Sequence, residues 1–216
     1  MRKEIRSYVL RQGRTTPSQQ RALDLLLPKF GLPFSSSHID SRQIFNRTAP
    51  LVLEIGSGMG ETTAQIAQAH PEVDYIAVEV HGPGVGSLLK KIAELELKNL
   101  RVIRHDAVEV MSAMIPDGAL AGIHLFFPDP WPKKRHHKRR IVQPDFLALA
   151  AQKLSPGGYF HAATDWPEYA VHMDETFRSS PSFSPGEKHE RPVTKFEKRG
   201  LNLGHPVRDL LFLRKK

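Results

Sequence analysis

Short apolar runs alternate with amphipathic stretches along the chain from Leu51 onward. Short apolar runs between turn signals are typical of buried strands, and apolar side chains three or four residues apart are typical of helices. The predicted strands are 51–56, 74–80, 100–107, 123–130, 157–165 and 205–216. The predicted helices are 61–70, 84–97, 143–154 and 167–179. This alternation predicts parallel βαβ units, and therefore an α/β protein with a doubly wound sheet.

Residues 1–48 show neither periodicity clearly. The segment is rich in Arg, Gln, Ser and Pro, and its apolar stretch is 22–30. Such a composition predicts a basic, partly flexible N-terminal arm that ends in a segment docked on the core. We therefore divide the chain into an arm over residues 1–48 and one folded domain over residues 49–216.

The composition excludes several classes of protein. A length of 216 residues with 40% hydrophobic residues suits one sizeable core. The absence of cysteine excludes disulfides and thiolate metal sites. No apolar run is long enough to span a bilayer, and the first residues are charged where a signal peptide needs an apolar segment. We expect a cytoplasmic protein.

The charge is unbalanced and clustered. The 31 Lys and Arg against 23 Asp and Glu leave a net charge of +8. The excess is concentrated in residues 1–21 and 133–140. Clustered cations are typical of proteins that bind nucleic acid, although a solvated basic face is the simpler explanation of any single run.

Acidic residues stand at the ends of successive predicted strands. They are Glu54, Glu79, Asp106, Asp129 and Asp165. A single acid at such a place is usually a turn former or a helix cap. Because ligands of doubly wound sheets bind outside the carboxyl ends of the strands, five acids there predict one shared site.

A glycine-rich loop after the first strand points to a nucleotide-like cofactor. Gly56, Gly58 and Gly60 allow a tight turn and close approach of a ligand, and Glu79 follows at the distance typical of a ribose-binding acid. The spacing E-x-G-x-G-x-G and the acid Glu54 favour S-adenosyl-L-methionine over a dinucleotide, because a carboxylate repels pyrophosphate and attracts ammonium and sulfonium. Asp106 would accept from the adenine amino group. The alternative is a nicotinamide-dependent oxidoreductase.

The stretch from Leu125 to Arg140 joins an acid to a basic run. Pro128 and Pro130 restrict the backbone around Asp129. Trp131 either stacks on an extruded base or packs on the core. The cations after it suit RNA phosphates, and they are Lys133, Arg135, Lys138, Arg139 and Arg140. His136 and His137 are adjacent and have no nearby acid or cysteine, so we expect no metal.

Several motifs together resemble one family. They are "LVLEIGSGMG", "VEVHGPGVG", "RHDAVEV", "LFFPDPWPKKRHHKRR", "ATDWPEYA" and "RPVTKFEKRG". This combination resembles TrmB, the bacterial tRNA (guanine-N7-)-methyltransferase family, over essentially the whole chain. The resemblance implies a class I methyltransferase fold with a mostly parallel seven-stranded sheet. It also implies that residues 49–216 are a catalytic domain, which methylates the guanine at position 46 of the tRNA variable loop and releases S-adenosyl-L-homocysteine.

The resemblance also implies roles for individual residues. Asp129 would be the catalytic-site acid. The cofactor would contact Glu54, Gly56, Gly58, Gly60, Glu79, Asp106 and Asp129. The substrate would contact Lys133, Asp165, Thr194, Lys195, Phe196 and Glu197. We expect a monomer, with a homodimer as the alternative.

Two other functions remain open at this point. The chain could methylate another RNA, or it could be a non-catalytic RNA-binding protein with a degenerate cofactor fold. The complete set of strand-end acids argues against the second, because a fold that no longer binds a cofactor has no need of them.

Overall fold

A computed structural model describes residues 6–9, 13–187, 191–192, 197 and 207–216. Its strands are β1 (Leu51–Ile55), β2 (Asp74–Val78), β3 (Leu100–Ile103), β4 (Leu120–Phe126), β5 (Leu154–Thr164), β6 (Phe183–Pro185) and β7 (Arg208–Arg214). Its α-helices are α1 (Pro17–Phe30), α2 (Ser41–Phe45), α3 (Glu61–Ala69), α4 (Gly82–Glu94), α5 (Ala107–Met114), α6 (Pro144–Lys153) and α7 (Pro167–Ser179). A 3₁₀ helix, η1 (Lys134–Arg139), follows β4.

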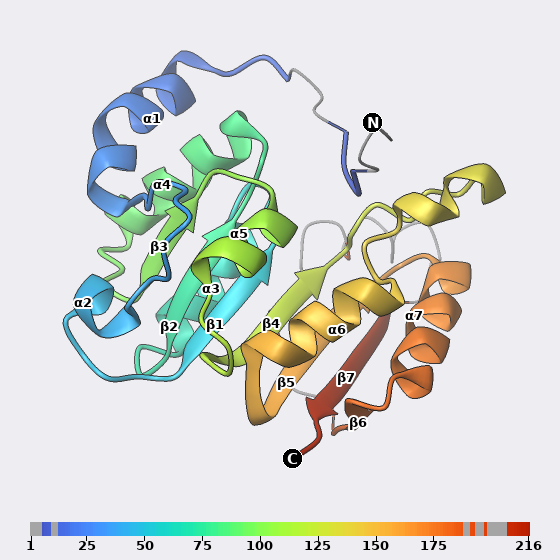
Figure 1. The fold of residues 1–216 in the computed structure, drawn as a ribbon. Coiled ribbons are helices and arrows are strands. Elements are labelled where there is room, and N and C mark those ends of the chain that lie inside the picture. Colours follow the sequence, from blue (N-terminus) through green and yellow to red (C-terminus); the bar gives the residue numbers. More distant parts are fainter. Residues whose placement is uncertain (1–5, 10–12, 188–190, 193–196, 198–206) are drawn as a thin grey trace.

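The strands form one seven-stranded sheet in the order β3-β2-β1-β4-β5-β7-β6 (Figure 1). Strands β1 to β5 are parallel, and β7 runs antiparallel to both of its neighbours. The predicted doubly wound, mostly parallel seven-stranded sheet is therefore confirmed. The order reverses at β1 and β4, and this switch point is where such sheets bind ligands.

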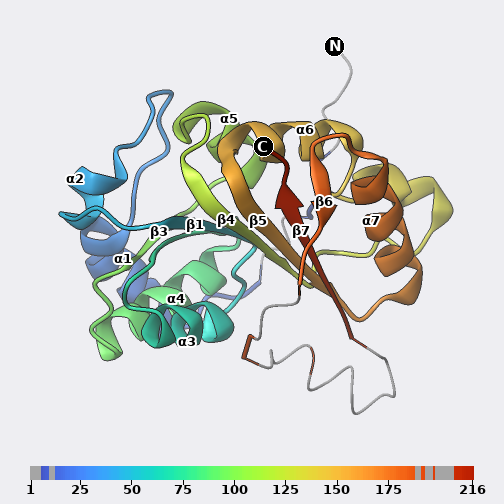
Figure 2. The same cartoon turned by 90° about the horizontal axis from the view of Figure 1, so that it is seen from below.

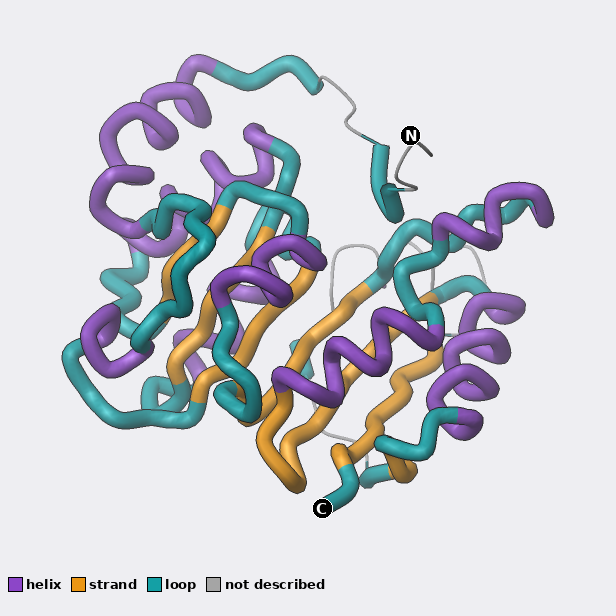
Figure 3. The backbone as a smooth tube through the Cα atoms, viewed as in Figure 1, coloured by secondary structure: helices purple, strands orange, loops and turns teal. Residues whose placement is uncertain are grey.

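Helices cover the two faces of the sheet differently, and each face has its own apolar core. Figure 2 shows α3 and α4 on one side and α5 and α6 on the other. Apolar side chains of α1, α3 and α4 pack against β1, β2 and β3 in one core. Those of α5, α6 and α7 pack on the opposite face in a second core that reaches β7. The alternation of strands and helices is also visible in the backbone tube (Figure 3).

The described part of the N-terminal arm is more ordered than its composition predicts. Helix α1 begins with a capping box, in which the Thr16 hydroxyl accepts from the Gln19 backbone and the Gln19 side chain accepts from the Thr16 backbone. Buried Ala22 and Leu23 then join the core with α3 and α4. The prediction of a docked segment is confirmed for α1, but the helix itself was missed because its apolar face is short.

Candidate active site

A cavity of about 260 Å³ opens at the carboxyl ends of β1, β2 and β4. Backbone and side chains from six separate stretches of the chain form its walls. They include Gly56, Gly58, Glu79, Asp106 and Asp129. The structure therefore brings five of the predicted cofactor residues into one space, and it leaves Glu54 and Gly60 outside the cavity wall.

Glycine is required at three positions of the loop after β1, for structural reasons that differ between them. All three have a positive φ, at 75° for Gly56, 56° for Gly58 and 72° for Gly60. A Cβ on Gly56 or Gly58 would meet nothing within 4 Å, so both leave open backbone beside the cavity. A Cβ on Gly60 would lie 2.5 Å from the Leu88 side chain, so Gly60 allows α3 and α4 to approach each other.

Glu79 connects the glycine loop to the end of β2. Its carboxylate accepts from the backbone N–H of Gly58 at 2.7 Å and of His81 at 2.8 Å. The side chain lines the cavity although the residue is 8% exposed. Glu79 therefore fixes the shape of the loop and presents a carboxylate edge to any ligand in the cavity.

Glu54 lies at the end of β1, directly before the glycine loop, and is buried. The Thr63 hydroxyl donates to its Oε1 at 3.0 Å, and Oε2 has no hydrogen-bond partner among the described residues. Burial raises the pKa of Glu54 to about 7, against a lowering by the Thr63 hydrogen bond. A buried carboxylate with an unused oxygen is suited to receiving a cationic group of a ligand.

Asp106 caps α5 as well as lining the cavity. Its Oδ1 accepts from the backbone N–H of Val108 at 2.8 Å and of Glu109 at 3.2 Å. Burial raises the pKa of Tyr8, and Asp106 raises it further through its charge and a side-chain hydrogen bond. Asp106 therefore has two roles: it caps α5, which is an ordinary role for an acid at the end of a strand, and it lines the cavity.

The chain turns sharply on both sides of Asp129. Phe127 has φ 52° and Trp131 has φ 46°, which is the left-handed region that non-glycine residues rarely adopt. Each such residue costs of order 1–3 kcal/mol and persists only where surrounding contacts hold it. Between them, Pro128 and Pro130 limit the backbone further. Asp129 is therefore presented, exposed, on a constrained turn at the edge of the cavity.

Trp131 packs against the N-terminal arm. Its indole N–H donates to the carbonyl oxygen of Ser7 at 3.0 Å, and the Arg139 guanidinium lies 4.7 Å from its ring centroid. These contacts are with the arm and with η1, so they are not the packing on the core that was one of the two roles considered for Trp131. Ser7 and Tyr8 of the arm also line the cavity, and neither is among the predicted site residues.

The basic run contains two kinds of cation. Lys133, Arg135 and Lys138 are exposed around η1, so they remain available to phosphates. Arg140 is different, because only 1% of its side chain is exposed. The expectation that Arg140 contacts RNA is corrected by this burial.

Arg140 instead stabilises the turn that carries Asp129. Its Nε donates to the carbonyl oxygen of Pro130 at 2.8 Å, and its Nη2 lies 3.2 Å from Oε1 of Glu168 on α7. Its guanidinium also lies 4.9 Å from the ring centroid of Tyr169. These contacts tie the end of the basic run to both the Asp129 turn and α7.

The remaining predicted substrate residues are placed only in part. Asp165 follows β5 at the same edge of the sheet, half-buried, and it does not cap α7, whose N-cap is Trp166. Glu197 forms an ion pair with Arg191 at 2.6 Å. Thr194, Lys195 and Phe196 lie outside the described residues.

Two negative findings concern the described residues alone. Within them, no group of three or more His, Asp or Glu side chains could hold a metal ion, and this includes the surroundings of His136 and His137. Within the same ranges, no helix has the length and apolar character needed to cross a membrane.

Comparisons with known proteins agree with this geometry. A family model described as "Putative methyltransferase" matches residues 48–210. The tRNA (guanine-N(7)-)-methyltransferase of Aromatoleum aromaticum is 57% identical over 99% of this chain and 85% of its own length. The enzyme of the same name from Nitrosospira multiformis is 54% identical over 98% of this chain and 95% of its own length.

Solved structures share the fold at low sequence identity. The 16S rRNA methyltransferase KamB matches with a TM-score of 0.61 and 17% identity, over 83% of this chain and 95% of its own. A mutant of the 16S rRNA (adenine(1408)-N(1))-methyltransferase from Catenulisporales acidiphilia, solved with the cosubstrate SAM, has a TM-score of 0.56 and 17% identity, over 81% and 89%. These solved structures show the fold alone, whereas the sequence relatives and the family model establish that the chain belongs to the tRNA (guanine-N7-)-methyltransferase family.

Proposed function

We propose that this chain transfers the methyl group of S-adenosyl-L-methionine to N7 of guanine 46 in the tRNA variable loop. The observation that carries the proposal is the cavity that joins the glycine loop, Glu79 and Asp106 to the Asp129 turn. Family membership supports the reaction, and the choice of position 46 rests on the resemblance to TrmB. A nicotinamide-dependent oxidoreductase is disfavoured by the same family membership.

The residues around the cavity fit the proposed cofactor. Gly56 and Gly58 leave open backbone at its wall, and Glu54 keeps one buried carboxylate oxygen without a partner among the described residues. Glu54 would receive the ammonium group, Glu79 the ribose hydroxyls, and Asp106 the adenine amino group. When bound, S-adenosyl-L-methionine supplies an electrophilic methyl group on its sulfonium. The negative charge of these acids suits a cationic cofactor.

Asp129 would hold the guanine. N7 carries a lone pair and no proton, so its alkylation needs no base to create the nucleophile. What the site must do is align N7 with the methyl group and exclude water. The exposed carboxylate of Asp129 can accept from the guanine N1–H or amino group, and it would stabilise the positive charge that the ring gains.

Cations around η1 would position the tRNA through its phosphates. Lys133 is closest in sequence to Asp129 and would contact the target nucleotide, while Arg135, Lys138 and Arg139 would contact flanking phosphates. We also assign Asp165 and the segment from Thr194 to Glu197 to the substrate. Contacts of this kind fix the register of the RNA without reading its sequence.

The test is methyl transfer from tritiated S-adenosyl-L-methionine to unmodified tRNA, with mapping of the labelled base. We expect label at N7 of guanine 46 and none in a tRNA with adenine at that position. Asp129→Asn should reduce turnover by about 10²–10³-fold with both substrates saturating, because one stabilising contact to the developing charge is lost. Label at another base, or in ribosomal RNA only, would contradict the proposal.

A further inference from the structure

Two described residues of the segment between β6 and β7 lie on the α3 side of the sheet, beside β4 and β5. Arg191 and Pro192 line a cavity of about 220 Å³ there, together with side chains of α3, β4 and β5. The sheet beneath carries polar side chains in a row, since Glu54 pairs in register with His124 and His124 with His161. Buried polar side chains need partners. In this row Thr63 donates to Glu54, Tyr159 contacts His124, and Asp209 of β7 contacts His161.

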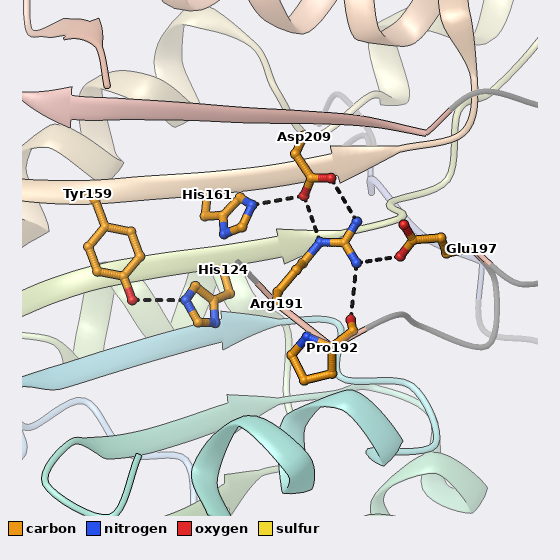
Figure 4. A network of polar contacts seen from close by, with 7 residues as sticks. All are labelled: His124, Tyr159, His161, Arg191, Pro192, Glu197 and Asp209. Atoms are coloured by element: carbon orange, nitrogen blue, oxygen red, sulfur yellow. Dashed lines mark hydrogen bonds and ion pairs between the residues drawn. The ribbon is translucent and has the colours of Figure 1, made fainter. Parts of the chain in front are cut away.

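Arg191 is at the centre of the resulting network (Figure 4). Its guanidinium binds Asp209 of β7 with two bonds, Nε to Oδ1 at 2.6 Å and Nη2 to Oδ2 at 3.1 Å. Its Nη1 lies 2.6 Å from Oε2 of Glu197. His161 of β5 contacts the same Asp209 through Nε2 and Oδ1 at 2.9 Å. The Arg191 side chain therefore connects Glu197 to Asp209 on β7, and Asp209 in turn contacts His161 on β5.

The charges in this network favour a fixed geometry. Only 5% of the Arg191 side chain and 15% of the Glu197 side chain are exposed. Burial pushes the pKa of Asp209 upward, but hydrogen bonds from His161 and Arg191 outweigh it and lower that pKa. A planar guanidinium can hold two carboxylates at once in defined directions, which an ammonium group cannot do.

Arg191 also lies over the end of β4. Its guanidinium carbon is 5.3 Å from the ring centroid of Phe126 and 5.5 Å from that of Phe127. Phe127 has the left-handed backbone conformation that begins the Asp129 turn. The same side chain thus contacts the base of the Asp129 turn and the Glu197 carboxylate.

We infer that Arg191 is a positioning residue of the tRNA site. It holds Glu197 at a fixed position relative to the Asp129 turn. This inference rests on the proposed function, in which Asp129 and Glu197 contact the same RNA substrate. Asp209 serves as the anchor of Arg191 on the sheet, and His161 orients Asp209. Arg191 itself does not line the 260 Å³ cavity, so it acts through its neighbours.

The test compares Arg191→Gln and Arg191→Lys with the full-length wild-type chain. We expect Arg191→Gln to reduce kcat/KM for unmodified tRNA by about 100-fold, because a small displacement of positioning groups has that effect. The dissociation constant for S-adenosyl-L-methionine, from calorimetry, should change less than about twofold, because Arg191 does not line the cofactor cavity and contacts its wall only through the rings of Phe126 and Phe127. Arg191→Lys keeps the positive charge but lacks the planar guanidinium that binds two carboxylates, so its kcat/KM should lie between those of Arg191→Gln and the wild type.

A double-mutant cycle with Glu197→Gln separates positioning from general stability. If Arg191 acts through Glu197, the double variant should lose about as much kcat/KM as Arg191→Gln alone. Losses that multiply, or a parallel loss of cofactor affinity, would overturn the inference. So would folded Arg191→Gln and Arg191→Lys variants with wild-type kcat and KM for tRNA.

Arg178→Gln is the matched control. It removes an exposed ion pair on α7, Nε to Oδ2 of Asp174 at 2.7 Å, and should leave both parameters unchanged. Failure of the proposed function would be visible in the wild-type enzyme alone, as absence of methylation at guanine 46. Failure of the inference would appear only as a difference between variants.

Discussion

The ionisation of Glu54 should make both the stability of the protein and its affinity for the cofactor depend on pH. Burial raises its pKa from 4.5 to about 7, and the neighbouring charge of Glu79 adds to that increase. A raised folded-state pKa means that the folded protein binds a proton that the unfolded chain has already released. Stability due to this group is therefore complete below pH 4.5 and declines as the pH rises to about 7.

We predict that the free energy of unfolding falls by about 3 kcal/mol across this window because of Glu54. Glu54→Gln should remove that part of the decline, as measured by urea unfolding at several pH values without cofactor. The affinity for S-adenosyl-L-methionine should rise between about pH 6 and 7.5 in the wild type, because the ionised carboxylate attracts the ammonium group. An equal rise in Glu54→Gln would show that another group is responsible.

Among the elements, η1 illustrates how cations of one run divide between stability and binding. Arg140 closes the run and is buried on Tyr169, whereas Arg135 is exposed on the helix itself. Arg140→Ala should lower the free energy of unfolding by about 1.5–3 kcal/mol, since it leaves the Pro130 carbonyl without its charged donor. Arg135→Ala should change it by less than about 0.5 kcal/mol. Chemical denaturation of both variants checks the difference.

Equal stability of the two variants would mean that the Pro130 and Glu168 contacts of Arg140 contribute nothing. Arg135→Ala is the control, because it removes the same charge from the same run.

Strands and helices with a clear periodic pattern of apolar residues could be predicted from the sequence. Those that exist because of contacts with other elements could not. The ten strands and helices expected after residue 50 are all present, because their apolar residues face one of two cores. Helix α5 is not among the predicted elements, because the apolar pattern assigns its first residue to the preceding strand and the ordinary role of Asp106 as a helix cap gives no helix length. The same limit applies to β6, which is three residues long and exists through pairing with β7.

Within the site, residue type was easier to predict than environment. The glycine loop, Glu79, Asp106 and Asp129 meet at one cavity as the strand ends required. Nothing in a single sequence states that Arg140 is buried while Lys138 is exposed, because the burial of Arg140 follows from its contacts with Glu168 and Tyr169 of α7. Ser7 and Tyr8 lie at the cavity through contacts with residues far apart in the chain, Ser7 with Trp131 and Tyr8 with Asp106.

For the whole molecule, the net charge of +8 favours a polyanionic partner. Exposed Lys138 lies beyond the carboxyl ends of the strands, where the cavity opens. Exposed Lys98 precedes β3 and therefore lies at the amino ends of the strands. We predict that Lys138→Ala weakens tRNA binding and flattens the slope of log K against log salt by about one unit. Lys98→Ala should leave the slope unchanged.

Fluorescence anisotropy with labelled tRNA over a range of salt concentrations measures both slopes. Cofactor affinity should be the same in the two variants, because neither lysine lines the cavity. Equal slopes for Lys138→Ala and Lys98→Ala would show that the charge acts diffusely over the surface.

The antiparallel β7 has a consequence for how the enzyme is made. This strand lies between β5 and β6 in the sheet but follows both in the chain, so β6 has no partner until residues 208–214 have left the ribosome. Arg191 is translated before Asp209, to which it is anchored. A nascent chain can therefore form the glycine loop early, but it completes the Arg191 network only after β7 has entered the sheet.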